Sequence, residues 1–144
     1  ITMGSGVLAR YPELPVDFLI DWEGPANRDD TGGCKGDVDG HLDEIAKCDD
    51  EAFWSEREAS TFMSEVPVPY LRIQSEEDHV QPDSEHAWIL VTTALNGESP
   101  WVTVNNGAPN ARYASWEELP LVSEKMEKPI MVWIADQAKN LLKL

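Results

Sequence analysis

Residue types that carry out proton-transfer chemistry lie close together in the stretch "YLRIQSEEDHVQPDSEHA", residues 70–87. Asp78 is followed directly by His79, and His86 comes eight residues after Asp78. A carboxylate beside an imidazole can orient the ring and stabilise its cation, and an acid–histidine pair can also bind a metal or lie unused in a polar loop. We take Asp78, His79 and His86 as the candidate catalytic residues, with a structural role as the alternative for each histidine.

Two further side chains are candidates for binding a substrate. Glu23 lies at the carboxyl end of an apolar run, the position at which α/β sheets place ligands, although a capping role is the alternative. Trp54 lies on the aromatic face of a predicted helix, where packing in the core or in a cap is the other interpretation. His41, the third histidine of the chain, is a further candidate for the catalytic base, because it would reach the site if its loop folded over it as a lid.

The acidic stretch "DVDGHLDE" at residues 37–44 resembles the middle of a calcium-binding loop. In that register, however, Lys35 would occupy the first ligand position and Ala46 the twelfth, where a calcium loop needs carboxylates. We therefore interpret Asp37, Asp39 and Asp43 as part of a solvated acidic loop. The sequence predicts no metal site and no cofactor.

The candidate residues must be positioned by helices that alternate with strands. Three short apolar runs predict buried strands at 16–22, 66–74 and 101–105. Predicted helices cover 1–11, 50–63, 84–96 and 130–142, with a short helical piece from Ser115 and a long loop at 27–50. This order predicts an α/β fold, a parallel sheet with helices on both faces. Three strands leave an open sheet edge, which an N-terminal half, another chain or a second copy in a homo-oligomer would cover.

Charge and cysteine content narrow the set of partners. The 144 residues contain 27 acids and 11 bases, and the net charge of −16 argues against nucleic acid and anionic membranes as partners. No apolar run approaches the roughly 20 residues that span a bilayer. Cys34 and Cys48 match no zinc-binding spacing, and we expect two free thiols, more typical of the cytoplasm, with a disulfide as the alternative. A small molecule remains the expected ligand.

Two segments resemble the C-terminal half of the α/β-hydrolase superfamily. They read "DFLIDWEGPAN" at residues 17–27 and "VPYLRIQSEEDHVQP" at residues 68–82, and the second is the more specific. The resemblance implies a single partial α/β domain over residues 1–144 with a cap-like insertion at 27–65. It also implies that Asp78 is the acid of a catalytic triad in a serine hydrolase that cleaves an ester or a similar acyl bond. An Asx-turn in the loop is the alternative role for Asp78.

The sequence departs from the pattern of the superfamily at two points. It contains no G-x-S-x-G nucleophile motif, so the resemblance implies a serine upstream of Ile1. The loop after the last predicted strand, "NNGAPNARY" at 105–113, contains no histidine, although the superfamily carries its catalytic histidine there. These departures keep two alternatives open. One is a non-catalytic relative that binds a small molecule or a partner chain, and the other is a small α/β domain that dimerises through its sheet edge.

Overall fold

A computed structural model of the chain describes residues 2–29, 34, 42, 44–78, 84–105, 107–123 and 130–142. Its centre is a three-stranded parallel sheet in the order β1 (Leu19–Trp22), β2 (Tyr70–Ile73) and β3 (Val102–Val104). Ser75 and Val122 add one isolated parallel bridge beyond the end of β2. The α/β class and the parallel sheet predicted from the sequence are thus confirmed.

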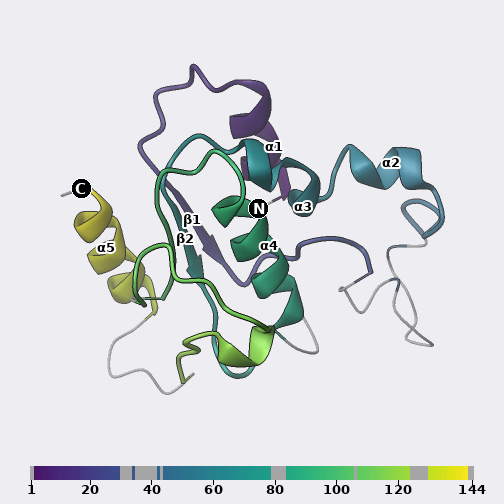
Figure 1. Ribbon diagram of the computed structural model, residues 1–144. Coiled ribbons are helices and arrows are strands. Elements are labelled where there is room, and N and C mark those ends of the chain that lie inside the picture. The colour runs from purple at the N-terminus through teal and green to yellow at the C-terminus, as the bar shows by residue number, and fades with distance from the viewer. Residues whose placement is uncertain are drawn as a thin grey trace.

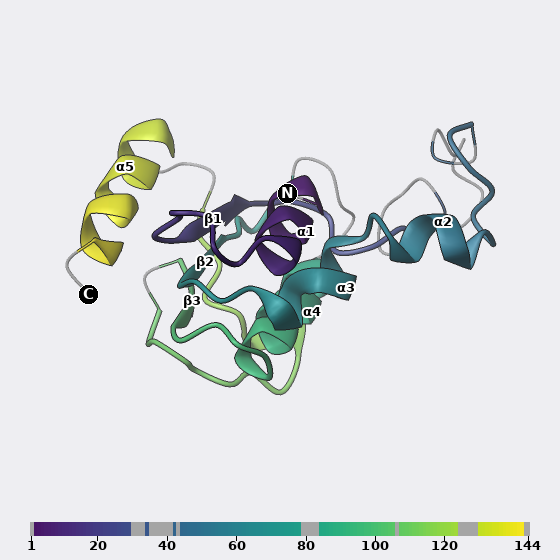
Figure 2. The same cartoon turned by 90° about the horizontal axis from the view of Figure 1, so that it is seen from above.

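Helices cover both faces of this sheet (Figures 1 and 2). On one face lie α1 (Thr2–Arg10), α3 (Ala59–Phe62) and α4 (Glu85–Leu95), and on the other lies α5 (Ile130–Leu141). The remaining helical pieces are α2 (Glu51–Ser55) and two 3₁₀ turns, η1 (Met63–Glu65) and η2 (Trp116–Glu118). Among the described residues, no helix has both the length and the apolar character needed to cross a bilayer.

The middle strand, β2, separates the two layers of core. Leu71 and Ile73 pack with Leu141 of α5, whereas Tyr70 belongs to the larger cluster formed with α4 and its neighbours. Successive side chains of a strand point to opposite faces, so Arg72 lies on the same face as Tyr70. A charged residue is thereby placed inside the layer between the sheet and α4.

The helix predicted at residues 50–63 is wrong as a single element. The chain forms α2, then an extended residue at Glu58 (φ −72°, ψ 134°), then α3 and η1. The predicted start is confirmed, because the side chain of Asp50 accepts a hydrogen bond from the Phe53 backbone amide at 3.0 Å. Ser84 takes the N-cap position of α4, at the start of the helix predicted over 84–96, but its side chain makes no capping hydrogen bond.

The segment between β1 and β2 projects from the body of the molecule around α2 (Figures 1 and 2). A disulfide joins Cys34 to Cys48 within it, so the expectation of two free thiols was wrong. The two cysteines are 14 residues apart in sequence, which matches no short motif, and only the folding back of the loop brings their Cα atoms to 5.7 Å.

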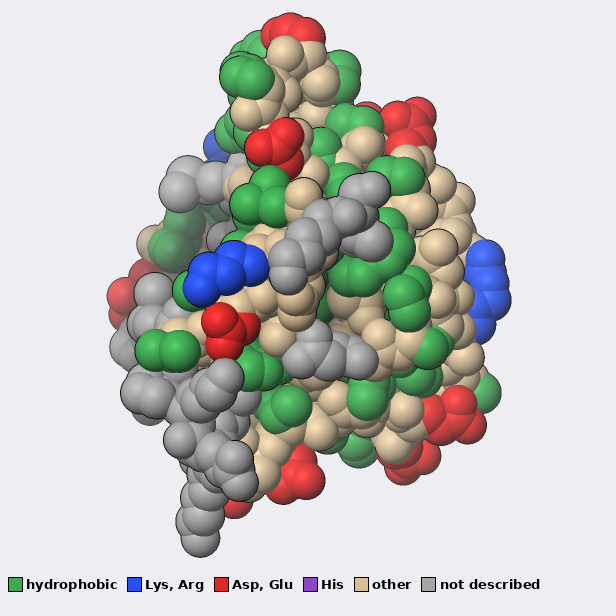
Figure 3. Space-filling view, turned by 90° about the vertical axis from the view of Figure 1, so that its left-hand side faces the viewer, with side chains coloured by type: hydrophobic (Ala, Val, Ile, Leu, Met, Phe, Trp, Pro, Cys, Tyr) green, Lys and Arg blue, Asp and Glu red, His purple; other side chains and the backbone are tan. Residues whose placement is uncertain are grey.

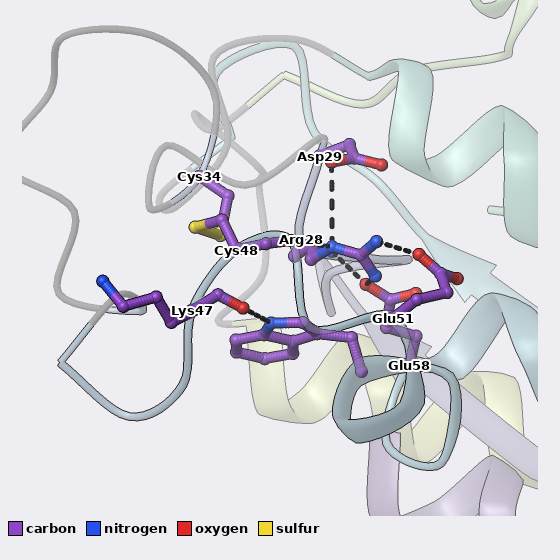
Figure 4. The surroundings of a disulfide bond; sticks show 8 residues. Arg28, Asp29, Cys34, Lys47, Cys48, Glu51 and Glu58 are labelled. Atoms are coloured by element: carbon purple, nitrogen blue, oxygen red, sulfur yellow. Dashed lines mark hydrogen bonds and ion pairs between the residues drawn. A yellow bond between two sulfur atoms is a disulfide. The ribbon is translucent and has the colours of Figure 1, made fainter.

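Arg28 ties this disulfide loop to the helices (Figure 4). Its side chain is 9% exposed, and its guanidinium donates to the Cys48 carbonyl at 2.7 Å and to Glu58 at 3.0 Å and also pairs with Glu51. A buried charge is stable only when it is paired, and here both carboxylates and a carbonyl surround it. One side chain thus joins the chain after β1, the disulfide loop and α2.

Candidate active site

The candidate site lies at the carboxyl end of β2, in the layer between the sheet and α4. Arg72 and Gln74 point into this layer from β2 and its extension, and Asp21 faces Arg72 from the paired position of β1. His86 enters from the first turn of α4, and Asp78 enters from the loop between β2 and α4. The α/β topology therefore gathers side chains from two strands, one helix and one loop.

Arg72 is the centre of the cluster and is fully buried. It forms a short ion pair with Asp21 and donates to the Gly24 carbonyl at 2.8 Å and to Gln74 Oε1 at 2.6 Å. Asp21 also accepts from the Tyr70 hydroxyl at 2.8 Å and from the Gly24 amide at 3.0 Å. The ion pair thus has the additional hydrogen bonds that a buried pair of charges needs.

The two nitrogens of His86 have partners of opposite kind. Nδ1 lies 3.1 Å from Nη2 of Arg72 and 3.1 Å from the Gly24 carbonyl, and Nε2 lies 3.0 Å from Oδ2 of Asp78. A guanidinium can only donate and a carbonyl can only accept, so Nδ1 can hydrogen-bond to Arg72 or to Gly24 but not to both. We assign the neutral tautomer in which Nδ1 accepts from Arg72 and the proton on Nε2 is donated to Asp78.

Burial lowers the pKa of His86, and the positive charge of Arg72 lowers it further. The carboxylate of Asp78 and the Gly24 carbonyl act in the opposite direction, because both would accept a hydrogen bond from the charged ring. The net lowering of the pKa agrees with a neutral ring.

The carboxylate of Asp78 is held in place from two sides. Its Oδ2 accepts from Gln74 Nε2 at 2.7 Å and from His86 Nε2, and its side chain is 2% exposed. Asp21, Arg72, His86 and Asp78 form one chain of charged and polar contacts. Chemically, the acid orients an imidazole, but Arg72 occupies the second ring nitrogen, so His86 cannot accept a proton from a substrate in this arrangement.

Of the residues predicted from the sequence, Asp78 and His86 are brought together. His79 and His41 lie outside the described residues, as do Asp37, Asp39 and Asp43. Among the described residues, no group of three or more histidine, cysteine or acidic side chains is placed to hold a metal ion.

Glu23 follows β1 directly and is nearly buried, with a left-handed backbone (φ 50°). Its carboxylate accepts hydrogen bonds from the amide of Ser75, at 3.0 Å, and from the Ser75 hydroxyl. Left-handed backbone is uncommon for residues other than glycine, and such conformations collect at functional sites. Glu23 therefore fixes the carboxyl ends of β1 and β2 to each other, at the end of the sheet where α/β folds place ligands.

Trp54 lies in the insertion, where its indole Nε1 donates to the Lys47 carbonyl at 2.9 Å. Its side chain is nearly buried and forms part of the lining of a cavity with Phe53 and Ile45. Trp54 therefore forms its hydrogen bond within the insertion. Asp78 and His86, in contrast, bond to each other and to residues of β2 and its extension.

Asn105 was not predicted, yet it closes the end of the sheet. It has a left-handed backbone (φ 45°), and its side chain bonds both backbone groups of Gln74, at 2.9 and 3.1 Å, and the Pro120 carbonyl at 2.6 Å. It is the first residue of the loop in which the resemblance expects the histidine.

Sequence reasoning also missed Asp21 and Arg72. The available signal was a single charge within each apolar strand run, "FLIDW" and "YLRIQ", because charges buried in a sheet require each other as partners.

In comparisons with known proteins, no protein-family model, curated protein or solved structure matches the chain.

Proposed function

We propose that this chain forms the C-terminal part of an α/β-hydrolase-like protein that cleaves an ester or a related acyl bond, and that Asp78 is its triad acid. The observation that carries the proposal is the position of Asp78. Its carboxylate is buried just past the end of the middle strand of a parallel sheet and accepts a hydrogen bond from an imidazole. This is the environment in which a carboxylate orients a histidine and stabilises its cation.

In this proposal, a serine from residues outside this sequence attacks the acyl carbon, and the acyl-enzyme is then hydrolysed by water. A histidine takes the serine proton, and Asp78 stabilises the resulting cation. His86 serves as a positioning residue, because both of its nitrogens already have buried partners. The sequence offers His79 and His41 as the base.

Hydrolysis of p-nitrophenyl butyrate tests whether the nucleophilic serine lies outside these 144 residues. We expect the 144 residues expressed alone to release no p-nitrophenol above the uncatalysed rate, and the longest natural chain that carries them to turn the ester over. Full activity of the 144 residues alone would contradict the assignment of the serine to other residues.

One observation favours a second candidate, a hydrolase-like protein that binds a ligand without catalysis. In the loop after β3, where the resemblance expects a histidine, the side chain of Asn105 forms hydrogen bonds with the backbone of Gln74 and Pro120. A fluorophosphonate probe separates the two candidates on the natural chain. Covalent labelling of a serine supports the enzyme, whereas a folded chain that takes no label supports the binding protein.

A further inference from the structure

A cavity of about 320 Å³ lies in the projecting insertion, lined by residues that follow β1 and by residues of α2 and its surroundings. Its volume is within the range of about 300–1,000 Å³ that is common for small-molecule sites. Its walls are mainly apolar and include Pro25, Ala26, Leu42, Ile45, Phe53 and Trp54. The cavity is made by residues that the Asp78 site does not use.

The polar groups at this cavity are already paired with protein partners. Arg28 is engaged by Glu51, Glu58 and the Cys48 carbonyl, and the indole N–H of Trp54 is engaged by Lys47. Arg57 stacks on the ring of Phe53, 3.8 Å from its centroid, and donates to the Phe53 carbonyl. A ligand would therefore meet apolar and aromatic surface, with the acids and bases neutralising one another.

Described residues of the cavity are joined to the rest of the fold by specific contacts. Arg28 donates to the carbonyl of Cys48, which forms the disulfide with Cys34 (Figure 4), and the Ser60 amide donates to the Ala26 carbonyl at 3.0 Å, which joins the cavity to α3. A preformed cavity binds with less loss of conformational freedom than one that must be ordered by its ligand.

We propose that this cavity binds an uncharged, predominantly apolar small molecule. Apolar lining supplies the affinity, and the rings of Phe53 and Trp54, which pack edge to face with centroids 5.1 Å apart, favour a ligand that contains a ring. The net charge of −16 disfavours an anion, and a cation would have to compete with Arg28 for Glu51 and Glu58. This site does not depend on the proposed hydrolase activity.

Two probes of similar ring structure test the proposal by fluorescence titration of the folded chain. N-phenyl-1-naphthylamine is uncharged, and 8-anilinonaphthalene-1-sulfonate adds one negative charge. We expect the uncharged probe to bind with one-to-one stoichiometry and at least about tenfold more tightly than the sulfonate. Equal affinities, or binding without saturation, would overturn the proposal.

Ile45→Asp locates the binding, because Ile45 lines the cavity and is 67% exposed, so that the substitution leaves the core intact. Leu142→Asp is the matched control, on a side chain 63% exposed after the end of α5. We expect Ile45→Asp to weaken the uncharged probe at least tenfold and Leu142→Asp to leave it unchanged, with the circular dichroism of both like that of the parent. Equal effects of the two variants would overturn the proposal. The readout uses no ester, so its failure leaves the hydrolase proposal standing.

Discussion

Each charged or titratable side chain at the end of β2 is buried beside a side chain that pairs with it. Arg72 is buried against Asp21, burial and the charge of Arg72 lower the pKa of His86, and Asp78 accepts a hydrogen bond from His86 Nε2. The sequence placed Asp78 and His86 as candidates in a loop and a helix. It could not show that they meet, because the loop between them decides which way each side chain turns.

Stability should depend on pH through His86. Its pKa is lowered in the folded chain from the ordinary value of about 6.5, so the unfolded chain binds more protons between the two values. The contribution of His86 to stability is therefore present above pH 6.5 and is lost as the pH falls through the folded pKa. Urea unfolding between pH 7.5 and 5.5 should show this loss. His86→Gln should flatten the dependence in this window, whereas His79→Gln and His41→Gln should retain it. An unchanged slope in His86→Gln would contradict the assignment.

Asp21→Asn should lower the free energy of unfolding by about 3–5 kcal/mol, because it leaves Arg72 as a buried charge without its closest counter-ion. Asp17→Asn makes the same chemical change on an exposed residue four positions earlier and should stay within about 0.5 kcal/mol of the parent. Urea denaturation of both variants measures the difference. A loss below about 1 kcal/mol for Asp21→Asn would show that the ion pair is not buried as described.

At the scale of elements, three close contacts hold the helical layer together. Gly6 of α1 leaves room for the ring of Phe62, Arg10 stacks over that ring at 4.3 Å, and Gly97 after α4 lies against the backbone of Ser64. The sequence predicted the helix ends well, because caps are local signals. It joined α2, α3 and η1 into one helix, because contacts with α1 and α4, distant in sequence, decide where that segment bends.

Gly97→Ala should destabilise the fold by about 1–3 kcal/mol or more, because an added Cβ would lie 2.1 Å from the Ser64 carbonyl oxygen and backbone would have to move. Gly4→Ala is the control, and we expect it to raise the stability instead of lowering it. Its added Cβ makes an ordinary contact with Leu19 at 3.6 Å, so alanine should stabilise α1 by about 1 kcal/mol. Thermal unfolding distinguishes them, and an increase in Tm for Gly97→Ala would contradict the contact between α4 and η1.

At the scale of the molecule, the described strands form a small sheet with β1 and β3 at its edges. Trp22 of β1 is 42% exposed, and on the side where α5 lies hydrophobic side chains are grouped between acidic ones (Figure 3). The α/β class could be read from the sequence because it depends on the alternation of elements. The neighbour of β1 on its other side could not be read, since the alternation of helices and strands does not identify what lies beside an edge strand.

The 144 residues alone should associate into dimers, because β1 lies at an edge of the described sheet beside exposed apolar side chains, and such an edge is a template for another chain. Trp22→Lys should shift the chain to monomer in sedimentation velocity, since a charge on an edge strand opposes pairing. Ile45→Lys, on a side chain of the insertion that is 67% exposed, is the control and should leave the dimer unchanged. A parent chain that sediments as a monomer at high concentration would contradict this expectation.

The central proposal is that Asp78 acts as the triad acid, and the most direct test is kcat for p-nitrophenyl butyrate with the longest natural chain that carries these residues. Asp78→Asn should lower kcat by about 10³- to 10⁴-fold in a chain that remains folded, the size of effect seen when a triad acid loses its charge. Glu77→Gln, the same change on the exposed neighbouring acid, should leave kcat within about twofold. A loss below tenfold in Asp78→Asn, or an equal loss in Glu77→Gln, would contradict the role proposed for Asp78.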